Sequence, residues 1–226
     1  MSVVTEIRTV RRGSKRRLVL LDDEPWRIAP ADVLREAGLQ VGDTGTDAEM
    51  VERLSKVEGR SARDRAVRLL TYRDRSSAEL MARLDEDGYL PQVAADTVTR
   101  LLDLGLLDDD RFARALARSL TRTKGLGRSR ASREMIARGV DPDAVSAVLE
   151  EALPPEDEEN AALAQARVFA RRVGATRDRV AARLMRKGYA PRIALSAARE
   201  ACEAIADGPD DGGWDTADPP ADDMPF

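Results

Sequence analysis

Apolar and polar residues follow two different periods along this chain. Up to about residue 29, short aliphatic and β-branched runs such as EIRTV and RRLVLL are separated by the turn sequences GSK and DDEP. From about residue 46 to residue 206, apolar residues recur every three or four positions, as they do in amphipathic helices. The sequence therefore predicts a small β hairpin or three-stranded meander followed by a mainly α-helical body.

The segment between these two parts contains short elements. We expect a short helix at 30–37 and a loop over GLQVGDTGTD. A long helix begins at Thr46 or Asp47 and runs toward Tyr72. Gly59 is a candidate interruption of that helix, because glycine destabilises a helix interior.

The helical body contains a repeat with a period near fifty residues. The strings GYLP (88–91), GVDP (139–142) and GYAP (188–191) place their glycines 51 and 49 residues apart. Apolar residues also recur four positions before each glycine and six and fourteen positions after it, and we expect such shared positions to be buried. These positions are Leu84, Met135 and Leu184; Ala94, Val145 and Ala194; and Leu102, Leu153 and Cys202.

The G-x-x-P string predicts a corner between two helices. Glycine adopts the left-handed conformation that ends a helix, and proline suits the first turn of the next one. In the first copy we expect helices at 77–87 and 92–104, with Ser76 and Glu79 as a capping box. A further helix precedes each pair, at about 61–72, 109–122 and 157–172. The predicted fold is mainly α, with three tandem three-helix modules stacked in an elongated repeat.

These features divide the chain into five parts. We expect a β-hairpin-like N-terminal segment with a short helix at 1–45, helical modules at 46–106, 107–153 and 154–206, and a disordered acidic tail at 207–226. The tail holds seven aspartates and no lysine or arginine. Without the tail, the net charge of −4 becomes +3, from 37 basic and 34 acidic residues. A basic body with an acidic tail is typical of proteins that deal with nucleic acid or with proteins bound to it.

Several classes of chemistry have no support in the residues. The chain has no histidine and one cysteine, Cys202, which leaves no histidine-based catalysis and no structural zinc site. The acidic strings LDDDR (107–111) and PPEDEEN (154–160) are candidate cation ligands, but both also suit the first turn of a helix. We expect no enzyme activity, metal or other cofactor. No signal peptide or membrane span is recognisable, so we expect a cytoplasmic protein.

The middle of the chain is strongly basic. Between Arg111 and Arg138 there are nine basic residues and one acidic residue, Glu134. Four arginines have helical spacing on one face, with Phe112, Leu116 and Leu120 on the other. The string TRTKGLGRSR then reads as a flexible basic loop. Two interpretations remain: a solvated helix face, or a surface for DNA phosphates or an acidic protein groove. The candidate contact residues are Arg111, Arg114, Arg118, Arg122, Lys124, Arg128 and Arg130.

The strings LLDDDRFARALARS (106–119), YRDRSSAEL (72–80) and KGLG (124–127), together with the three-module layout, resemble the bacterial RecX family of regulatory proteins. The resemblance covers about residues 60–203. It implies a crescent of helical modules that lodges in the groove of the RecA recombinase filament. It also implies modulation, usually inhibition, of ATP hydrolysis, strand exchange and co-protease activity in DNA repair, with no catalysis by this chain. The alternative is a protein that binds DNA directly and limits RecA loading. We expect a monomer.

The final residues DDMPF resemble the C-terminal tip of bacterial single-stranded DNA-binding protein. That resemblance implies docking of Asp222, Asp223, Met224, Pro225 and Phe226 on a partner that recognises such tips. Two other interpretations of the acidic tail stay open. It can fold back on the arginines of the second module, or it can act only as a solubilising segment.

Overall fold

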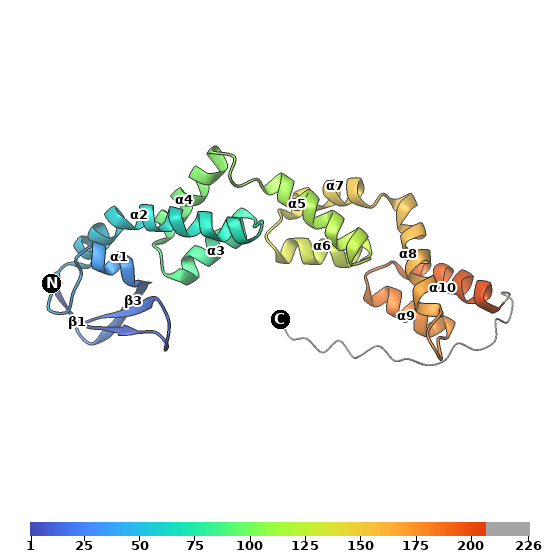
Figure 1. Cartoon of the computed structure of the whole chain (residues 1–226), viewed down its shortest axis with the longest axis horizontal. Coiled ribbons are helices and arrows are strands. Elements are labelled where there is room, and N and C mark those ends of the chain that lie inside the picture. The colour runs from blue at the N-terminus through green and yellow to red at the C-terminus, as the bar shows by residue number, and fades with distance from the viewer. Residues whose placement is uncertain (207–226) are drawn as a thin grey trace.

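The computed structural model describes residues 1–206, and its elements lie in a row from one end of the molecule to the other (Figure 1). The strands are β1 (Ser2–Thr9), β2 (Arg16–Leu21), β3 (Glu24–Pro30) and β4 (Thr44–Gly45). The helices are α1 (Ala31–Glu36), α2 (Asp47–Tyr72), α3 (Ser77–Asp87), α4 (Pro91–Asp103), α5 (Asp109–Arg118), the π-helical turn η1 (Ser119–Thr123), α6 (Arg128–Ala137), α7 (Pro142–Ala152), α8 (Pro155–Ala170), α9 (Arg177–Arg186) and α10 (Pro191–Ala206). The predicted tail at 207–226, with its candidate docking residues, lies outside the described residues.

The N-terminal segment forms one antiparallel sheet with the order β3-β2-β1-β4. The predicted three-stranded meander and the short helix after it are both present. The expected loop at 38–47 also contains β4, which pairs with the start of β1 through Ser2–Gly45 and Val3–Thr44. The sequence TG carries no apolar alternation, so this strand depends on pairing with β1 and has no signal of its own.

The helical body is mainly α and has three tandem three-helix modules, as predicted. Module 1 contains α2, α3 and α4; module 2 contains α5, η1, α6 and α7; module 3 contains α8, α9 and α10. Each module has its own buried apolar cluster, and the cluster of module 1 continues into the sheet through Val4, Val19 and Ala29. The sheet is therefore an extension of module 1.

The G-x-x-P strings form the predicted corners. Gly88, Gly139 and Gly188 have φ of 94°, 78° and 92°, in the left-handed region that favours glycine. Each proline, three residues later, is the first residue of α4, α7 or α10. There its missing N–H costs no intrahelical hydrogen bond.

Two of the three predicted buried positions of the repeat are confirmed, and the third is wrong by one residue. The residues four before and six after each glycine are buried in all copies. Fourteen after the glycine, Leu102 is 40% exposed and Cys202 is only partly buried, although Leu153 is buried. The shared buried position is thirteen after the glycine, at Leu101, Ala152 and Ala201. That residue lies seven after the previous buried position, which is two helical turns on the same face.

Helix α2 runs without interruption from Asp47 to Tyr72, so Gly59 does not break it. This helix begins with a full capping box: Thr46 Oγ1 accepts from the Glu49 N–H, and the Glu49 carboxylate accepts from the Thr46 N–H at 2.7 Å. The predicted box of Ser76 and Glu79 is only half formed. Ser76 Oγ accepts from the Glu79 N–H at 3.0 Å, but the Glu79 carboxylate binds arginines instead.

A buried ion pair joins the sheet to module 1. Glu58 of α2 is fully buried and accepts from Arg27 of β3 at 3.1 Å and from the Leu90 N–H at 2.9 Å. Burial raises the pKa of Glu58, and these two donors offset only part of that effect. Among residues 1–206, no helix is long and apolar enough to cross a membrane. The same residues hold no cluster of three or more acidic or cysteine ligands placed for a metal ion.

Candidate interaction surface

Helix α5 presents the predicted arginine face. Asp108 caps the helix by accepting from the Arg111 N–H at 2.8 Å, and Asp109 and Asp110 lie in its first turn, where the helix dipole favours acids. Phe112 and Leu116 are buried in the core of module 2. The acidic string LDDDR therefore starts a helix, and the arginines that follow face away from the core.

Three arginines line a shallow groove between the first and last helices of module 2. Arg114, Arg118 and Arg122 form one wall, and Val148, Glu151 and Ala152 of α7 form the other. The hollow between them measures about 80 Å³. Its one acid, Glu151, lies 3.5 Å from Arg114, and both side chains are about half exposed or more. We call this surface the arginine groove.

A π-helical turn ends the arginine row. In η1 the Lys124 N–H donates to the Ser119 carbonyl, five residues back, at 3.0 Å. Thr121 Oγ1 donates to the Ala117 carbonyl at 2.9 Å, so the hydroxyl of this buried residue has a partner. The wider turn keeps Leu120 in the core while Arg122 stays on the exposed side. Single π turns inside helices are often found at functional sites.

Arg111 belongs to a different part of the surface from Arg114 and Arg118 of the same helix and Arg122 of η1. It lines a small depression at the boundary with module 1, next to Asp74, Arg75 and Leu106. Leu104 and Leu106, in the same α4–α5 connection, are both more than half exposed. Arg111 therefore extends the basic surface toward module 1.

The remaining three predicted contact residues lie where module 2 meets module 3: Lys124 follows η1, and Arg128 and Arg130 are in the first turn of α6. Arg128 donates to the Leu153 carbonyl at 2.8 Å and to Glu150 at 2.7 Å, and its side chain is 24% exposed. Arg130 pairs with Glu134 at 3.1 Å and donates to the Arg186 carbonyl of module 3 at 3.2 Å. Lys124 lies 3.8 Å from Glu134. The seven candidates therefore do not form one patch: Arg114, Arg118 and Arg122 are together, and Arg128 and Arg130 make contacts within the fold.

The string KGLG is not the flexible loop expected from its glycines. Gly125, Leu126 and Gly127 are buried, the Tyr189 hydroxyl donates to the Gly125 carbonyl at 3.2 Å, and Lys187 Nζ donates to the Lys124 carbonyl at 2.7 Å. A Cβ on Gly127 would lie 2.5 Å from the backbone of Gly188. Glycine is required here for close backbone approach between two modules.

The two junctions between modules share one geometry. At each junction, the backbone carbonyl of the residue before the corner glycine accepts a hydrogen bond. The donor is the residue that caps the N-terminus of the second helix in the preceding module. At the first junction Ser76 Oγ donates to the Arg138 carbonyl at 2.7 Å, and at the second the Gly127 N–H donates to the Lys187 carbonyl at 2.9 Å. The corner at this glycine thus ends one helix and also contacts the preceding module.

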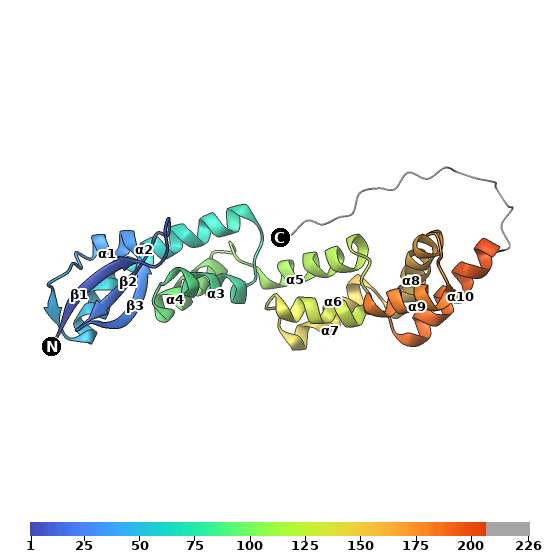
Figure 2. The ribbon, with the colours of Figure 1, turned by 90° about the horizontal axis from the view of Figure 1, so that it is seen from below.

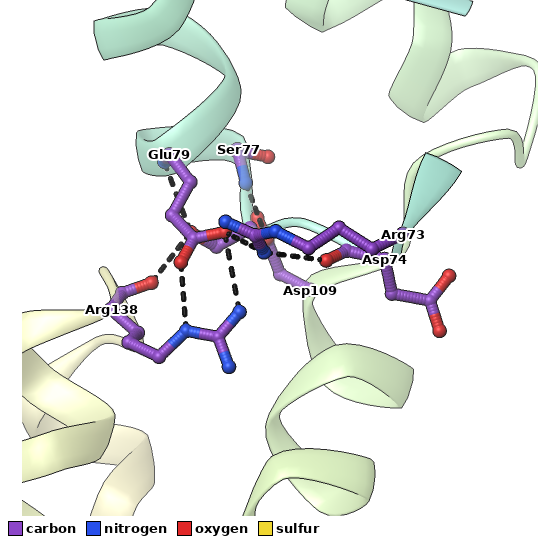
Figure 3. A network of polar contacts seen from close by, with 7 residues as sticks. Arg73, Asp74, Ser77, Glu79, Asp109 and Arg138 are labelled. Atoms are coloured by element: carbon purple, nitrogen blue, oxygen red, sulfur yellow. Dashed lines mark hydrogen bonds and ion pairs between the residues drawn. The ribbon is translucent and has the colours of Figure 1, made fainter. Parts of the chain in front are cut away.

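The first junction also carries a charged cluster that the sequence did not reveal (Figure 3). Glu79 of α3 accepts from Arg138 at 2.8 Å and from Arg73 at 2.7 Å, and Asp109 accepts from the Ser77 N–H at 2.7 Å. The Arg138 guanidinium also lies 5.0 Å from the centre of the Phe112 ring. Burial acts to raise the pKa of Glu79, but the hydrogen bonds from Arg138 and Arg73 together with their positive charges outweigh burial and lower it.

Comparison with known proteins identifies the modules. Residues 62–101 match the family model described as RecX, first three-helix domain, and residues 108–149 match that of the second three-helix domain. The chain belongs to the RecX family. The matched ranges cover helices of module 1 and module 2, including the whole of α5.

Relatives of the RecX family align with much of the chain. Regulatory protein RecX of Bacillus subtilis is 32% identical over 149 residues, which cover 66% of this chain and 56% of the relative. Regulatory protein RecX of Mycolicibacterium smegmatis is 35% identical over 100 residues, covering 44% of this chain and 53% of the relative. The chain thus spans a little over half the length of these relatives. A solved structure described as regulatory protein RecX superposes with a TM-score of 0.55 over 85% of this chain and 97% of its own, at 20% identity, and has the same fold.

Proposed function

We propose that this chain is a regulatory protein that binds the RecA recombinase filament and inhibits its ATP hydrolysis, strand exchange and co-protease activities in DNA repair. Membership of the RecX family, whose relatives are named regulatory proteins, supports a regulatory role. The observation that carries the proposal at the level of residues is the arginine groove. Three neighbouring arginines of α5 and η1 line one wall of the groove, and Glu151 is the one acid among its lining residues.

The shape of the molecule supports a filament as the target. The modules lie in a row, with the sheet at one end and module 3 at the other (Figures 1 and 2). Stacked helical repeats present long surfaces that can contact several subunits of a polymer at once. The arginines of α5 lie near the middle of this row, where they would steer the molecule toward an acidic filament that carries DNA.

The test is charge reversal with a matched control. The variant Arg114→Glu/Arg118→Glu/Arg122→Glu should lose inhibition of the ATPase of the cognate RecA, while its far-ultraviolet circular dichroism stays unchanged. The control Arg60→Glu/Arg63→Glu/Arg68→Glu makes the same charge change on exposed arginines of α2 and should keep inhibition. Inhibition by both variants would show that the groove is not the contact surface.

Direct DNA binding is the alternative function, favoured by the same arginines. A DNA-coating protein should bind naked DNA tightly, and its affinity should fall steeply with salt because phosphate contacts release counterions. A filament regulator should bind naked DNA weakly and the RecA filament tightly. Fluorescence anisotropy with labelled single-stranded DNA, at several salt concentrations and with and without RecA, separates these two functions.

A further inference from the structure

We propose that the acidic segment 207–226 docks in the arginine groove of the same chain and competes there with the target of the groove. This inference deepens the proposed function, since it concerns regulation of the same surface. The docking itself does not depend on what that target is.

Charge complementarity is the first argument. The segment carries seven aspartates and no basic residue, while residues 111–138 carry nine basic residues and one acidic residue. Within residues 1–206, neither Arg118 nor Arg122 forms an ion pair, and Arg114 has only Glu151, at 3.5 Å. The groove therefore offers guanidinium groups that the described part of the fold leaves unused, and guanidinium groups bind carboxylates strongly.

The composition of the groove is the second argument. Its far wall contains Val148 and Ala152, so a peptide lying between α5 and α7 would contact apolar side chains as well as arginines. The segment provides matching apolar groups among its aspartates, at Trp214, Met224 and Phe226. An acidic peptide with interspersed apolar residues fits this surface better than a purely acidic one does.

The reach of the segment is the third argument. It follows α10 of module 3, and module 3 packs directly on module 2 through Gly127 and Gly188. In Figure 2, α5 lies along one long side of the molecule, and α10 ends on that same side, at the end of the row away from module 2. A chain of 20 residues spans at most about 70 Å when extended. A module of helices this long is on the order of 25 Å across, so a segment that passes module 3 and part of module 2 stays within that length.

A nearer pair of arginines is the competing site on this chain. Arg177 and Arg199 line a cavity of module 3 together with Leu195 and Ser196. This site has two guanidinium groups where the groove has three. Arg177 is already 3.9 Å from Asp178, and Glu200 and Glu203 lie in the same helix as Arg199. These acids weaken the positive electrostatic potential at this site, which an aspartate-rich segment would need. We therefore place the segment on module 2.

A spin label in the full-length chain tests the docking. Cys202→Ser removes the single cysteine, and Ala217→Cys then allows a nitroxide to be attached inside the acidic segment. Amide signals of α5 and α7 should lose most of their intensity when the nitroxide is oxidised, and should recover at high salt. Signals of α2 and α3 should be unchanged. The loss should not depend on protein concentration, because the contact is within one chain.

Three variants decide the outcome. Replacing all seven aspartates of the segment by asparagine should restore the α5 and α7 signals, and so should Arg118→Glu/Arg122→Glu. The matched reversal Arg177→Glu/Arg199→Glu should leave the broadening in place. Broadening that survives the asparagine variant, that appears on module 3 alone, or that grows with concentration overturns the proposal. The experiment contains neither RecA nor DNA, so its failure is distinct from failure of the ATPase test.

Discussion

Glu79 of module 1 and Arg138 of module 2 form an ion pair at 2.8 Å across the first module junction. Arg73 approaches the same carboxylate at 2.7 Å, and the Arg138 guanidinium covers the Phe112 ring. The backbone of Arg138 is held as well, since its carbonyl accepts from Ser76 Oγ. A single carboxylate therefore connects the end of α2, the start of α3 and the end of α6.

Replacing this carboxylate should loosen the junction. Glu79→Gln keeps the size of the side chain but removes the charge that two arginines share, and should lower the free energy of unfolding by roughly 1–2 kcal/mol. Chemical denaturation measures the loss, and small-angle scattering should show a broader distribution of molecular lengths. The control is Glu86→Gln in the same helix, whose pair with Arg83 is local and exposed. An equal loss in both variants would contradict a special role for Glu79.

The same carboxylate should give the junction a dependence on pH. The pKa of Glu79 is lowered from its ordinary value of 4.5, so the unfolded chain binds the proton more readily than the folded chain does. Its stabilisation is complete above that ordinary value and is lost as the pH falls through the lowered one. The difference in unfolding free energy between the natural chain and Glu79→Gln should therefore shrink on acidification. Glu58, whose pKa is raised, acts in the opposite direction but equally in both proteins, and it cancels from the difference. A difference that stays constant down to low pH would contradict the assignment.

The second junction should be sensitive to a single methyl group. In Gly127→Ala the new Cβ would lie 2.5 Å from backbone atoms of Gly188 and Tyr189, and backbone cannot move aside as a flexible side chain can. We expect a loss of roughly 1–3 kcal/mol in the free energy of unfolding, with faster amide hydrogen exchange at the start of α6 and at the Gly188 corner.

Gly59→Ala is the matched control for that substitution. Gly59 lies inside α2, and a Cβ there would meet only the end of the Arg63 side chain, at 3.4 Å. Alanine should raise the free energy of unfolding by about 0.5–1 kcal/mol, because glycine is the poorer helix former. If Gly127→Ala were neutral, the close approach of the two modules would not exist in solution.

Two arginines of module 2 should differ in what they do for stability. Arg128→Ala removes bonds to Glu150 and to the Leu153 carbonyl, and should cost roughly 1–2 kcal/mol in thermal or chemical unfolding. Arg118→Ala removes an exposed side chain from the arginine groove, and should change stability by less than about 0.5 kcal/mol. Equal effects would mean that the structural and exposed arginines have been assigned wrongly.

The repeat and its corners could be predicted because glycine and proline have strong backbone preferences. Gly88, Gly139 and Gly188 adopt the expected left-handed conformation, and the prolines begin the expected helices. The apolar position thirteen after each glycine was missed because Leu102, Leu153 and Cys202 are also apolar. Residue type alone does not distinguish neighbours at the edge of a buried face.

The spacing of the basic residues did not predict which of them line the groove and which bond to other parts of the fold. Arg122 and Arg128 look equivalent in the sequence, yet one lines the groove and the other bonds to Leu153 and Glu150. What separates them is contact with residues more than twenty positions away, which a local pattern does not contain. The Glu79 cluster could not be predicted for the same reason, since Arg138 is 59 residues from its partner Glu79.

The contact between Gly127 and Gly188 limits how independently modules 2 and 3 can fold. Leu126 is buried in the apolar core of module 2, and the Tyr189 hydroxyl of module 3 donates to the neighbouring Gly125 carbonyl of module 2. A fragment containing only module 2 would expose these buried groups to water, whereas a fragment that starts at α5 and includes module 3 would keep them covered. Although modules 2 and 3 each have an apolar core, we therefore expect module 3 to contribute to the stability of module 2.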